Sequence, residues 1–547
     1  MRYPKTWLFL LFLIGITRTF NAQEVPQSVN NKGVYEFLDE LANLQIITIN
    51  SAIKPYSRLF ISNRLKEADE KREQLNPRQQ KELDFYTLDF GKEISNGTTA
   101  QTAFAKASAV KGRNGATGKK RFDLLYYRDS LFSLTINPIL GGEIFNNSTG
   151  KATYWRNGAE ARGYIKNWGF YASLRDNHEK PLLGKPEFLT TSEGGHLKGN
   201  TDWSEMQGGI TYSWKWGSAG LVKEKIEWGN NYNGANIFGG NNPTFVQLKL
   251  HISPVKWFDF NYFHGWLNSM VVDSNNSYWV NNSYGKDYRE VYHKKFIAAN
   301  MFTFTPFKNL NVSAGNSIVY NDENVNPAYL IPIFFYKSVD HSLTSGIDNM
   351  NSQMFFDISS RQIKHLHVYG TWFIDELSVS RFTVKDQWNF FSYKAGFRVT
   401  DFPVANLSFT TEFTYTYPLT FQHYVPTLTF ENAGYNLGHY LKDNSRELYV
   451  AFDYRPLRTL SINVFFSVAE RGPDYTALGV PRLGNPPLLT VDWKNTSYGI
   501  KASYQVINDL YCWGSFTDSN ISGNKDWSAE YFFGKKRTVN AGVTFGF

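Results

Sequence analysis

The chain has 547 residues, of which 17% are aromatic, and its mean hydropathy is only −0.40. Beyond the N-terminus it contains none of the apolar runs of about 20 residues that cross a membrane as helices, which excludes a helical membrane protein. The formal charge of +8 leaves an anionic partner open, and the single cysteine, Cys512, excludes an internal disulfide bond.

Residues 1–22 are expected to be a signal peptide. Arg2 and Lys5 precede the apolar run Trp7–Ile16, and Ala22 offers a small residue for cleavage. A membrane anchor is the alternative, and it is disfavoured because the run is too short to span a bilayer comfortably. Export argues against nucleic acid as the anionic partner, whereas an anionic polymer, an anionic outer surface or an ordinary solvated surface stay open.

Residues 23–90 are predicted to form a small helical module outside the membrane. Apolar residues have helical spacing in Gly33–Leu44, Ser57 is suited to cap a second helix, and Asn76-Pro77 is suited to begin a third. Residues 91–129, rich in Gly, Ala, Ser and Thr, are predicted to be a linker and lead-in.

From residue 130 to residue 547 the sequence alternates with a period of two. In Leu407–Tyr417 large apolar residues share one strand face and Ser, Thr and Glu the other, and Arg537–Phe547 repeats this pattern to the last residue. Such strands suit an antiparallel transmembrane β-barrel with an apolar face toward lipid and a polar lumen. A soluble sandwich also alternates, so the connections between strands have to discriminate.

Short and long connections alternate along this region, as in outer-membrane barrels. Eight short turns, from Lys166-Asn167 to Ile507–Asp509, are separated by mostly long polar connections such as 229–243 and 422–444. Eight turns join sixteen strands in pairs, and a first strand near 131–145 and a last strand at 537–547 bring the total to about 18. Phe122–Tyr127 would make the number odd and is therefore expected to be a lead-in or plug segment.

Several long connections combine aromatic rings with amide and guanidinium groups. Sugar rings stack on flat aromatic faces, and their hydroxyls need such polar partners. The alternative is an ordinary polar loop with interfacial aromatic residues. The candidate carbohydrate-binding residues are Tyr232, Asn241, Asn242, Tyr278, Trp279, Tyr284 and Arg289.

Charged residues on predicted lumen-facing positions form a second candidate group. They could bind a charged polymer, block the channel, or pair with one another as an ordinary barrel interior, and the last is favoured because buried charges must be paired. These residues are Glu143, Arg156, Glu160, Arg162, Glu412, Asp453 and Arg455.

No metal, cofactor or reaction is expected. His365 and His367 would share one face of a predicted strand at 363–374, but no carboxylate or cysteine is identified to complete a metal site. The glycines of Gly234–Gly240 lack the Lys-Ser/Thr ending of a phosphate-binding loop, and no nucleophile motif stands out.

Three blocks of the sequence, residues 224–269, 292–320 and 326–337, carry a resemblance to a known family. With the Glu227-Trp228-Gly229 and Gly239–Pro243 patterns, the chain resembles the Wzi-type capsule-assembly family of outer-membrane proteins, in a branch distinct from the enterobacterial members. The resemblance implies an 18-stranded barrel, a periplasmic helical module and a non-catalytic, lectin-like role in holding exported polysaccharide at the cell surface.

The partners expected on this basis are capsular polysaccharide or exopolysaccharide, outer-membrane lipid and lipopolysaccharide, and the barrel-assembly machinery. Two other functions stay open from the sequence. One is a passive porin or saccharide-uptake channel, which an open lumen would favour. The other is an outer-membrane lipid or glycan hydrolase, which would need a Ser-His-acid cluster at the barrel wall.

Overall fold

The computed structural model describes residues 24–93, 122–129, 131–199, 201–283, 285–343, 349–476 and 484–547. The expected signal peptide and most of the expected linker lie outside these ranges. Within them, no helix has the length and apolar character needed to cross a membrane.

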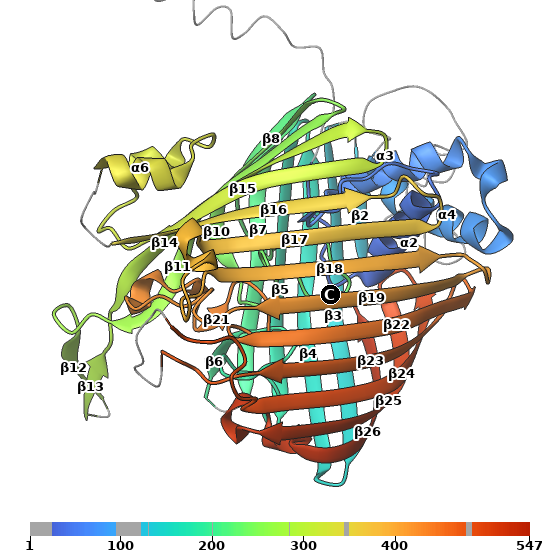
Figure 1. Cartoon of the computed structure of the whole chain (residues 1–547). Coiled ribbons are helices and arrows are strands. Elements are labelled where there is room, and N and C mark those ends of the chain that lie inside the picture. The colour runs from blue at the N-terminus through green and yellow to red at the C-terminus, as the bar shows by residue number, and fades with distance from the viewer. Residues whose placement is uncertain are drawn as a thin grey trace, which may run out of the picture.

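A closed barrel of 18 antiparallel strands forms the body of the molecule (Figure 1). Each strand pairs with the next in chain order, and the last pairs with the first, with Phe545 opposite Leu140. The expected barrel and its strand number are therefore confirmed. The strands are β3 (Phe132–Asn147), β4 (Gly150–Ile165), β5 (Trp168–Lys180), β7 (Asp202–Trp214), β8 (Gly217–Glu224), β10 (Phe245–Val255), β11 (Phe258–Val272), β14 (Tyr292–Phe307), β15 (Leu310–Tyr320), β16 (Met350–Ser360), β17 (Leu366–Glu376), β18 (Phe390–Thr400), β19 (Leu407–Thr416), β22 (Ser445–Leu457), β23 (Leu460–Arg471), β24 (Trp493–Ile507), β25 (Leu510–Gly523) and β26 (Gly534–Phe545).

Strand β2 (Leu125–Arg128) lies outside this count. It pairs with the first part of β3, with Leu125 opposite Ile136, beyond the point at which β26 ends. It therefore adds no nineteenth strand to the ring. The shorter elements elsewhere are β1 (Ile53–Lys54), β6 (His196–Lys198), β9 (Glu227–Trp228), β12 (Tyr278–Asn282), β13 (Gly285–Arg289), β20 (Glu431–Asn432), β21 (Tyr435–Asn436), α6 (Tyr336–Leu343), η3 (Pro327–Leu330), η4 (Val379–Phe382), η5 (Pro426–Leu428), η6 (Lys525–Trp527) and η7 (Glu530–Phe532).

The two ends of the barrel differ in their connections. Eight short turns lie at one end, called here the short-turn end, and all long connections lie at the other, called the loop end. The two-residue turn between β3 and β4 is the exception, being short at the loop end. Along β26 the side chains of Val539 and Val543 are exposed on the outer face, whereas Thr538 and Thr544 are buried on the inner face, as the alternation predicts.

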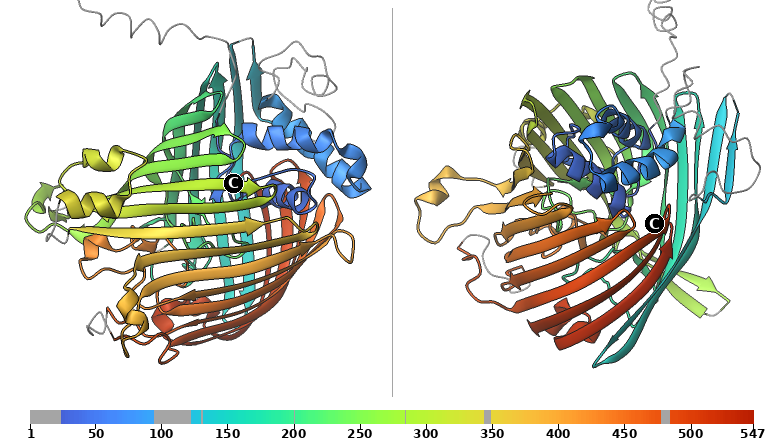
Figure 2. Two further views of the ribbon diagram at one scale, coloured as in Figure 1. Left: turned by 45° about the horizontal axis from the view of Figure 1, so that its top comes forward. Right: turned by 90° about the vertical axis from the view of Figure 1, so that its right-hand side faces the viewer.

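Three helices form a module at the short-turn end, and Figure 2 (right) shows them lying across the barrel mouth. They are α2 (Lys32–Asn43), α3 (Arg58–Asp69) and α4 (Pro77–Phe90), with short 3-10 turns η1 (Arg72–Gln74) and η2 (Gly91–Glu93). The expected helix starts are confirmed, because the Ser57 side chain accepts a hydrogen bond from the Phe60 amide at 3.1 Å and Asn76 forms a capping box with Gln79.

Candidate functional site

A packed apolar core occupies the middle of the lumen. Two long connections enter it, residues 225–244 between β8 and β10 and residues 417–444 between β19 and β22. The Trp228 ring lies 5.2 Å from that of Phe238 and 5.3 Å from that of Phe263 on β11, and Phe238 lies 5.3 Å from Phe430 of the second connection. The buried members of this lumen core are Ala52, Ile226, Trp228, Ile237, Phe238, Phe245, Phe263, Ile297, Ala299, Met301, Val319, Phe355, Phe373, Phe421, Phe430 and Leu437.

The lumen core is also tied to the N-terminal segment. Strand β1 pairs with β9 of the first connection, with Ile53 opposite Trp228, and Lys54 forms an ion pair with Glu227 at 2.6 Å. Both partners of this pair are largely buried, so each charge depends on the other for its stability in the interior. The module and the first connection therefore form one continuous filling of the barrel.

Arg361, in the turn after β16, joins the module to the wall. Its guanidinium donates to Asp39 Oδ1 at 2.6 Å and to Asn43 Oδ1 at 2.7 Å, both on α2. Tyr232 of the first connection donates its hydroxyl to Asp39 Oδ2 at 2.6 Å, and the Arg398 guanidinium lies 4.6 Å from the centre of its ring. Burial raises the pKa of Asp39, but the positive charges of Arg361 and Arg398 and the hydrogen bond from Tyr232 together hold that pKa well below its ordinary value.

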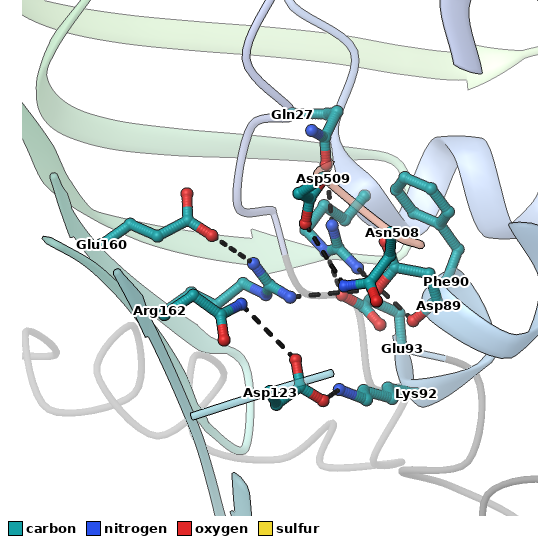
Figure 3. Close-up of polar contacts among 12 residues, drawn as sticks. Gln27, Asp89, Phe90, Lys92, Glu93, Asp123, Glu160, Arg162, Asn508 and Asp509 are labelled. Atoms are coloured by element: carbon teal, nitrogen blue, oxygen red, sulfur yellow. Dashed lines mark hydrogen bonds and ion pairs between the residues drawn. The ribbon is translucent and has the colours of Figure 1, made fainter. Parts of the chain in front are cut away.

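A second polar cluster lies around Arg58 of α3, and Figure 3 labels its partners Gln27, Asp89 and Glu93. Arg58 is buried and donates to Asp89 Oδ1 at 3.0 Å, to Glu93 Oε1 at 2.5 Å and to Gln27 Oε1 at 2.7 Å. Two carboxylates and one amide thus satisfy a single buried guanidinium, and removing Arg58 would leave two buried carboxylates without their closest cation.

The same cluster reaches the barrel wall through β4. Arg162 lies 3.2 Å from Glu160 and 3.9 Å from Asp89, and the turn between β24 and β25 brings Asp509 beside them. Burial, together with the negative charges of Asp89 and Glu160, raises the pKa of Asp509 to about 7. The contact between module and wall therefore contains a carboxyl group that is protonated over much of the acidic range.

The seven predicted lumen charges fall into three separate places rather than one network. Glu143 and Arg156 face the seam between β26 and β3, Glu160 and Arg162 lie in the Arg58 cluster, and the other three face the module and the first connection from β19 and β22. Each has a polar protein partner. The contacts are Glu143 with Trp513 Nε1 at 3.3 Å, Arg156 with the Gly546 carbonyl at 2.9 Å, Glu412 with Lys394 at 3.5 Å, Asp453 with Arg398 at 3.3 Å and Arg455 with Glu82 at 3.3 Å.

Two recesses lie between the N-terminal segment and the wall. One is lined by Arg58, Glu160, Arg162, Tyr171, Lys225 and Asp509 among others. The other is lined by Lys54, Tyr56, Glu224, Lys249, His251 and Asp259 among others. Charged and hydroxyl-bearing side chains line both, so either recess could hold a polar molecule.

The predicted aromatic loop 267–291 forms a hairpin, β12 with β13, that projects from the loop end (Figure 1). Trp279 is 66% exposed and lies opposite Tyr288, with 5.1 Å between ring centres. Tyr278, also exposed, lies opposite Arg289 on the other face of the hairpin, and Tyr284 lies outside the described residues. The structure thus brings Tyr278, Trp279 and Arg289 together in one exposed element.

The other candidate carbohydrate-binding residues lie elsewhere. The Asn241 carbonyl accepts a hydrogen bond from the Gly194 amide at 2.6 Å, and the buried Asn242 side chain donates to the Pro243 carbonyl at 2.9 Å. Tyr232 is held in the lumen by Asp39. These three residues belong to the first connection that fills the barrel and not to the hairpin.

His365 and His367 do not form a pair. Strand β17 begins at Leu366, so the predicted strand at 363–374 starts too early and His365 lies in the preceding turn with a φ of 73°. His365 Nδ1 lies 2.9 Å from the Thr400 carbonyl, whereas His367 Nε2 lies 2.9 Å from Ser359 Oγ. In the part of the chain that the structure describes, no group of three or more His, Cys, Asp and Glu side chains is placed to hold a metal ion.

Sequence reasoning identified the two segments only as long polar connections and missed their inward path. A signal was present in each, because apolar residues such as Ile237, Phe238 and Phe430 interrupt otherwise polar stretches. Large apolar side chains clustered in a connection indicate burial, since exposing them together to water is unfavourable.

Comparison with known proteins identifies solved structures that are similar to this barrel. No family model and no curated protein sequence matches the chain. Among solved structures, it is similar over 96% of its length to all of Wzi, an outer-membrane protein involved in group 1 capsule assembly in Escherichia coli and a carbohydrate-binding β-barrel, with a TM-score of 0.57 and 11% identity. Weaker similarities cover 76% of the chain and 90% of OccD3 (OpdP) of Pseudomonas aeruginosa, at TM-score 0.43 and 10% identity, and 75% of the chain and 97% of OccAB2 of Acinetobacter baumannii, at 0.42 and 9%. The resemblance to a Wzi-type barrel is thereby confirmed at the level of the fold.

Proposed function

We propose that this chain, which has the fold of Wzi, is an outer-membrane protein that binds surface polysaccharide and supports the assembly or attachment of capsule or exopolysaccharide. We further propose that it does so without catalysing a reaction. Its partners would be the polysaccharide, the lipid and lipopolysaccharide around the barrel, and the machinery that inserts barrels into the outer membrane.

The packed lumen core is the observation that carries this proposal. A transport barrel needs a water-filled lumen, whereas a binding barrel needs a rigid support for the surface it presents. Wzi is a carbohydrate-binding barrel involved in capsule assembly, and the chain shares its fold over 96% of its length. The same combination of filled barrel and exposed loop-end surface suits a polysaccharide too large to enter a pore.

The hairpin β12–β13 is the proposed contact with the sugar chain. Strand alternation places Trp279, Tyr288, Asn281 and Lys286 on one face, and all four are exposed. Two rings offer a flat apolar surface, and the amide and ammonium groups beside them can bind hydroxyl or carboxylate groups of a glycan.

The decisive cellular test deletes the gene and measures polysaccharide that stays on the cell against polysaccharide shed into the medium. We expect polysaccharide to move from the cell to the medium, because its attachment would be weakened. An unchanged distribution would contradict the attachment role.

The binding surface is tested with purified protein and the polysaccharide of the same cells. Substituting Trp279→Ala and Tyr288→Ala should weaken binding, since both rings are lost from one face. Val280→Ala, on the opposite face, is the matched control and should bind as the unsubstituted protein does. Equal weakening by the control would indicate disruption of the hairpin rather than loss of a contact.

A saccharide-uptake channel is the rival function, and the two recesses beside the N-terminal segment are the feature that it would use. Conductance across a planar bilayer distinguishes the two. We expect the reconstituted barrel to conduct little, and a steady open-channel current would favour the channel. Release of products from polysaccharide or phospholipid by the purified protein would instead favour a hydrolase.

A further inference from the structure

Four polar side chains occupy outward positions on a wall that should meet lipid. Tyr262 on β11, Asn300 on β14, and Asn316 and Tyr320 on β15 alternate with residues that face the lumen core, such as Phe263, Met301 and Val319. An amide that faces hydrocarbon without a hydrogen-bond partner would be strongly unfavourable. All four side chains are nevertheless buried, so part of the protein covers them on the outside.

The cover is residues 326–343, the flap, in the connection between β15 and β16. The Asn300 amide donates to the carbonyls of Pro332 and Phe334, both at 2.9 Å, and the Asn316 side chain accepts from the Tyr336 amide at 2.9 Å. Farther along, the Tyr262 hydroxyl donates to the carbonyl of Tyr329 at 2.9 Å.

These hydrogen bonds satisfy backbone groups of the flap that would otherwise lack partners within the membrane. Irregular backbone persists at membrane depth only where its N–H and C=O groups find partners within the protein. Here the outward asparagines of the wall supply those partners for the irregular stretch before α6. The flap therefore follows this path because the outer wall offers hydrogen-bond partners to its backbone. The polar residues of the wall are kept from lipid because the flap covers them.

The two sides of the flap differ in character. Tyr329 and Tyr336 are buried against Phe296 and Ile318 of the outer wall, whereas Ile333 and Phe335 are 66% and 45% exposed. Figures 1 and 2 show α6 outside the ring of barrel strands. The other exposed apolar residues of the flap are Leu330, Ile331, Phe334 and Leu343.

The exposed side of the flap continues the lipid-facing surface of the barrel. Phe356 and Ile358 on the outer face of the adjoining strand β16 are exposed in the same way. Strands β15–β18 have 11 residues each, which is about the length that spans a bilayer and little more, so their connections begin close to the membrane boundary. The next connection at the loop end, between β17 and β18, also exposes Val379 and Phe382.

We propose that the flap enters the membrane leaflet at the loop end and that the acyl chains of its lipids are the partner of Ile333, Phe335 and their neighbours. The flap thereby widens the apolar girdle on one side of the barrel at the outer boundary of the bilayer. Amphipathic segments of this kind bury their apolar face about 5–10 Å into the boundary between headgroups and acyl chains. This role is independent of polysaccharide binding.

The test uses the full-length barrel in phosphatidylcholine vesicles, with Cys512→Ser to remove the native thiol. A nitroxide is attached at Ile333→Cys, and its accessibility to oxygen, which partitions into lipid, is compared with that to a water-soluble nickel chelate. Ile358→Cys on the outer wall and Asn281→Cys on the exposed hairpin are the references for lipid and for water.

We expect high oxygen and low nickel accessibility at position 333, as at position 358. Nickel accessibility like that at position 281 would place the flap in water and overturn the proposal. Low accessibility to both reagents would also overturn it, because a second copy or another protein would then cover this surface.

The anchoring of the flap is tested separately with Asn300→Leu and Asn316→Leu together. These changes replace two polar positions of the outer wall by apolar ones and remove the hydrogen-bond partners of the flap backbone. Nickel accessibility at position 333 should therefore rise, while that at position 358 stays low. Ser352→Leu, at an outward position opposite Ile318, is the control and should change neither. Unchanged nickel accessibility of the label at position 333 in the double variant would show that the asparagines do not hold the flap.

Discussion

Replacing Arg361 by alanine should release the helical module from the barrel wall. Arg361 is buried, and its guanidinium also donates to Ser51 at 3.0 Å, besides its bonds to Asp39 and Asn43. The substitution leaves the Asp39 carboxylate in the interior without its closest cation. It also removes one hydrogen-bond partner from each of the other two residues.

The size of the effect follows from the burial of the pair. Removing one partner of a buried ion pair costs about 3–5 kcal/mol, since the remaining charge stays desolvated. At about 1.36 kcal/mol per tenfold change, the equilibrium between docked and released module should shift by a factor of roughly 100 to a few thousand. The double substitution Asp39→Asn with Arg361→Met should cost less, because no charge is left without a partner.

Hydrogen exchange measured by mass spectrometry on the reconstituted barrel is the assay. Amides of α2 should exchange faster in Arg361→Ala by up to the factor given above, whereas peptides from β24 and β25 should be unchanged. The pKa of Asp39 is held below its ordinary value of 3.8, so the pair stabilises the docked module above that pH and is lost only as the pH falls further. The difference between the proteins should therefore be constant from pH 5 to pH 8. Unchanged exchange in α2, or a double variant worse than the single one, would refute this reasoning.

Three further substitutions test the lumen core, the Arg58 cluster and a helix cap. Trp228→Ala should leave a cavity in the lumen core, cost about 3–5 kcal/mol and raise the conductance of the barrel in a planar bilayer, whereas the exposed Trp279→Ala should not. Asp509→Asn should flatten the pH dependence of thermal unfolding. A folded-state pKa raised to about 7 stabilises the folded protein at low pH, and that stability is lost as the pH rises from about 4 through 7. An equally steep dependence of the unfolding temperature on pH in the variant would contradict the assignment. Ser57→Ala removes the bond to the Phe60 amide and should cost about 0.5–2 kcal/mol, seen as faster hydrogen exchange in the first turn of α3 with α4 unchanged.

The wall of the barrel could be predicted from the sequence because its rules are local. Alternation of side chains along a strand and the alternation of short and long connections each depend on neighbouring residues, as do the caps at Ser57 and Asn76. These features predicted the closed barrel, its strand number and the starts of two helices. The boundaries of individual strands were less exact, as His365 shows.

The contents of the lumen could not be predicted in the same way. A period of two tells which face of a strand points inward but not what that face meets. The contact between Tyr232 and Asp39 joins residues 193 positions apart, and the packing of Trp228 against Phe355 depends on the path of a whole connection. Polarity even misleads at Asn300, where a polar residue that would suit the lumen points outward to bind the flap.

Pairing of β26 with β3 closes the wall around the interior. The apolar segments that fill this interior, residues 225–244 and 417–444, belong to the chain between those two strands, so their shielding from the surroundings depends on a seam that the last strand completes. A truncated chain that lacks its last strand would expose an apolar interior and an unpaired strand edge to proteases and to aggregation.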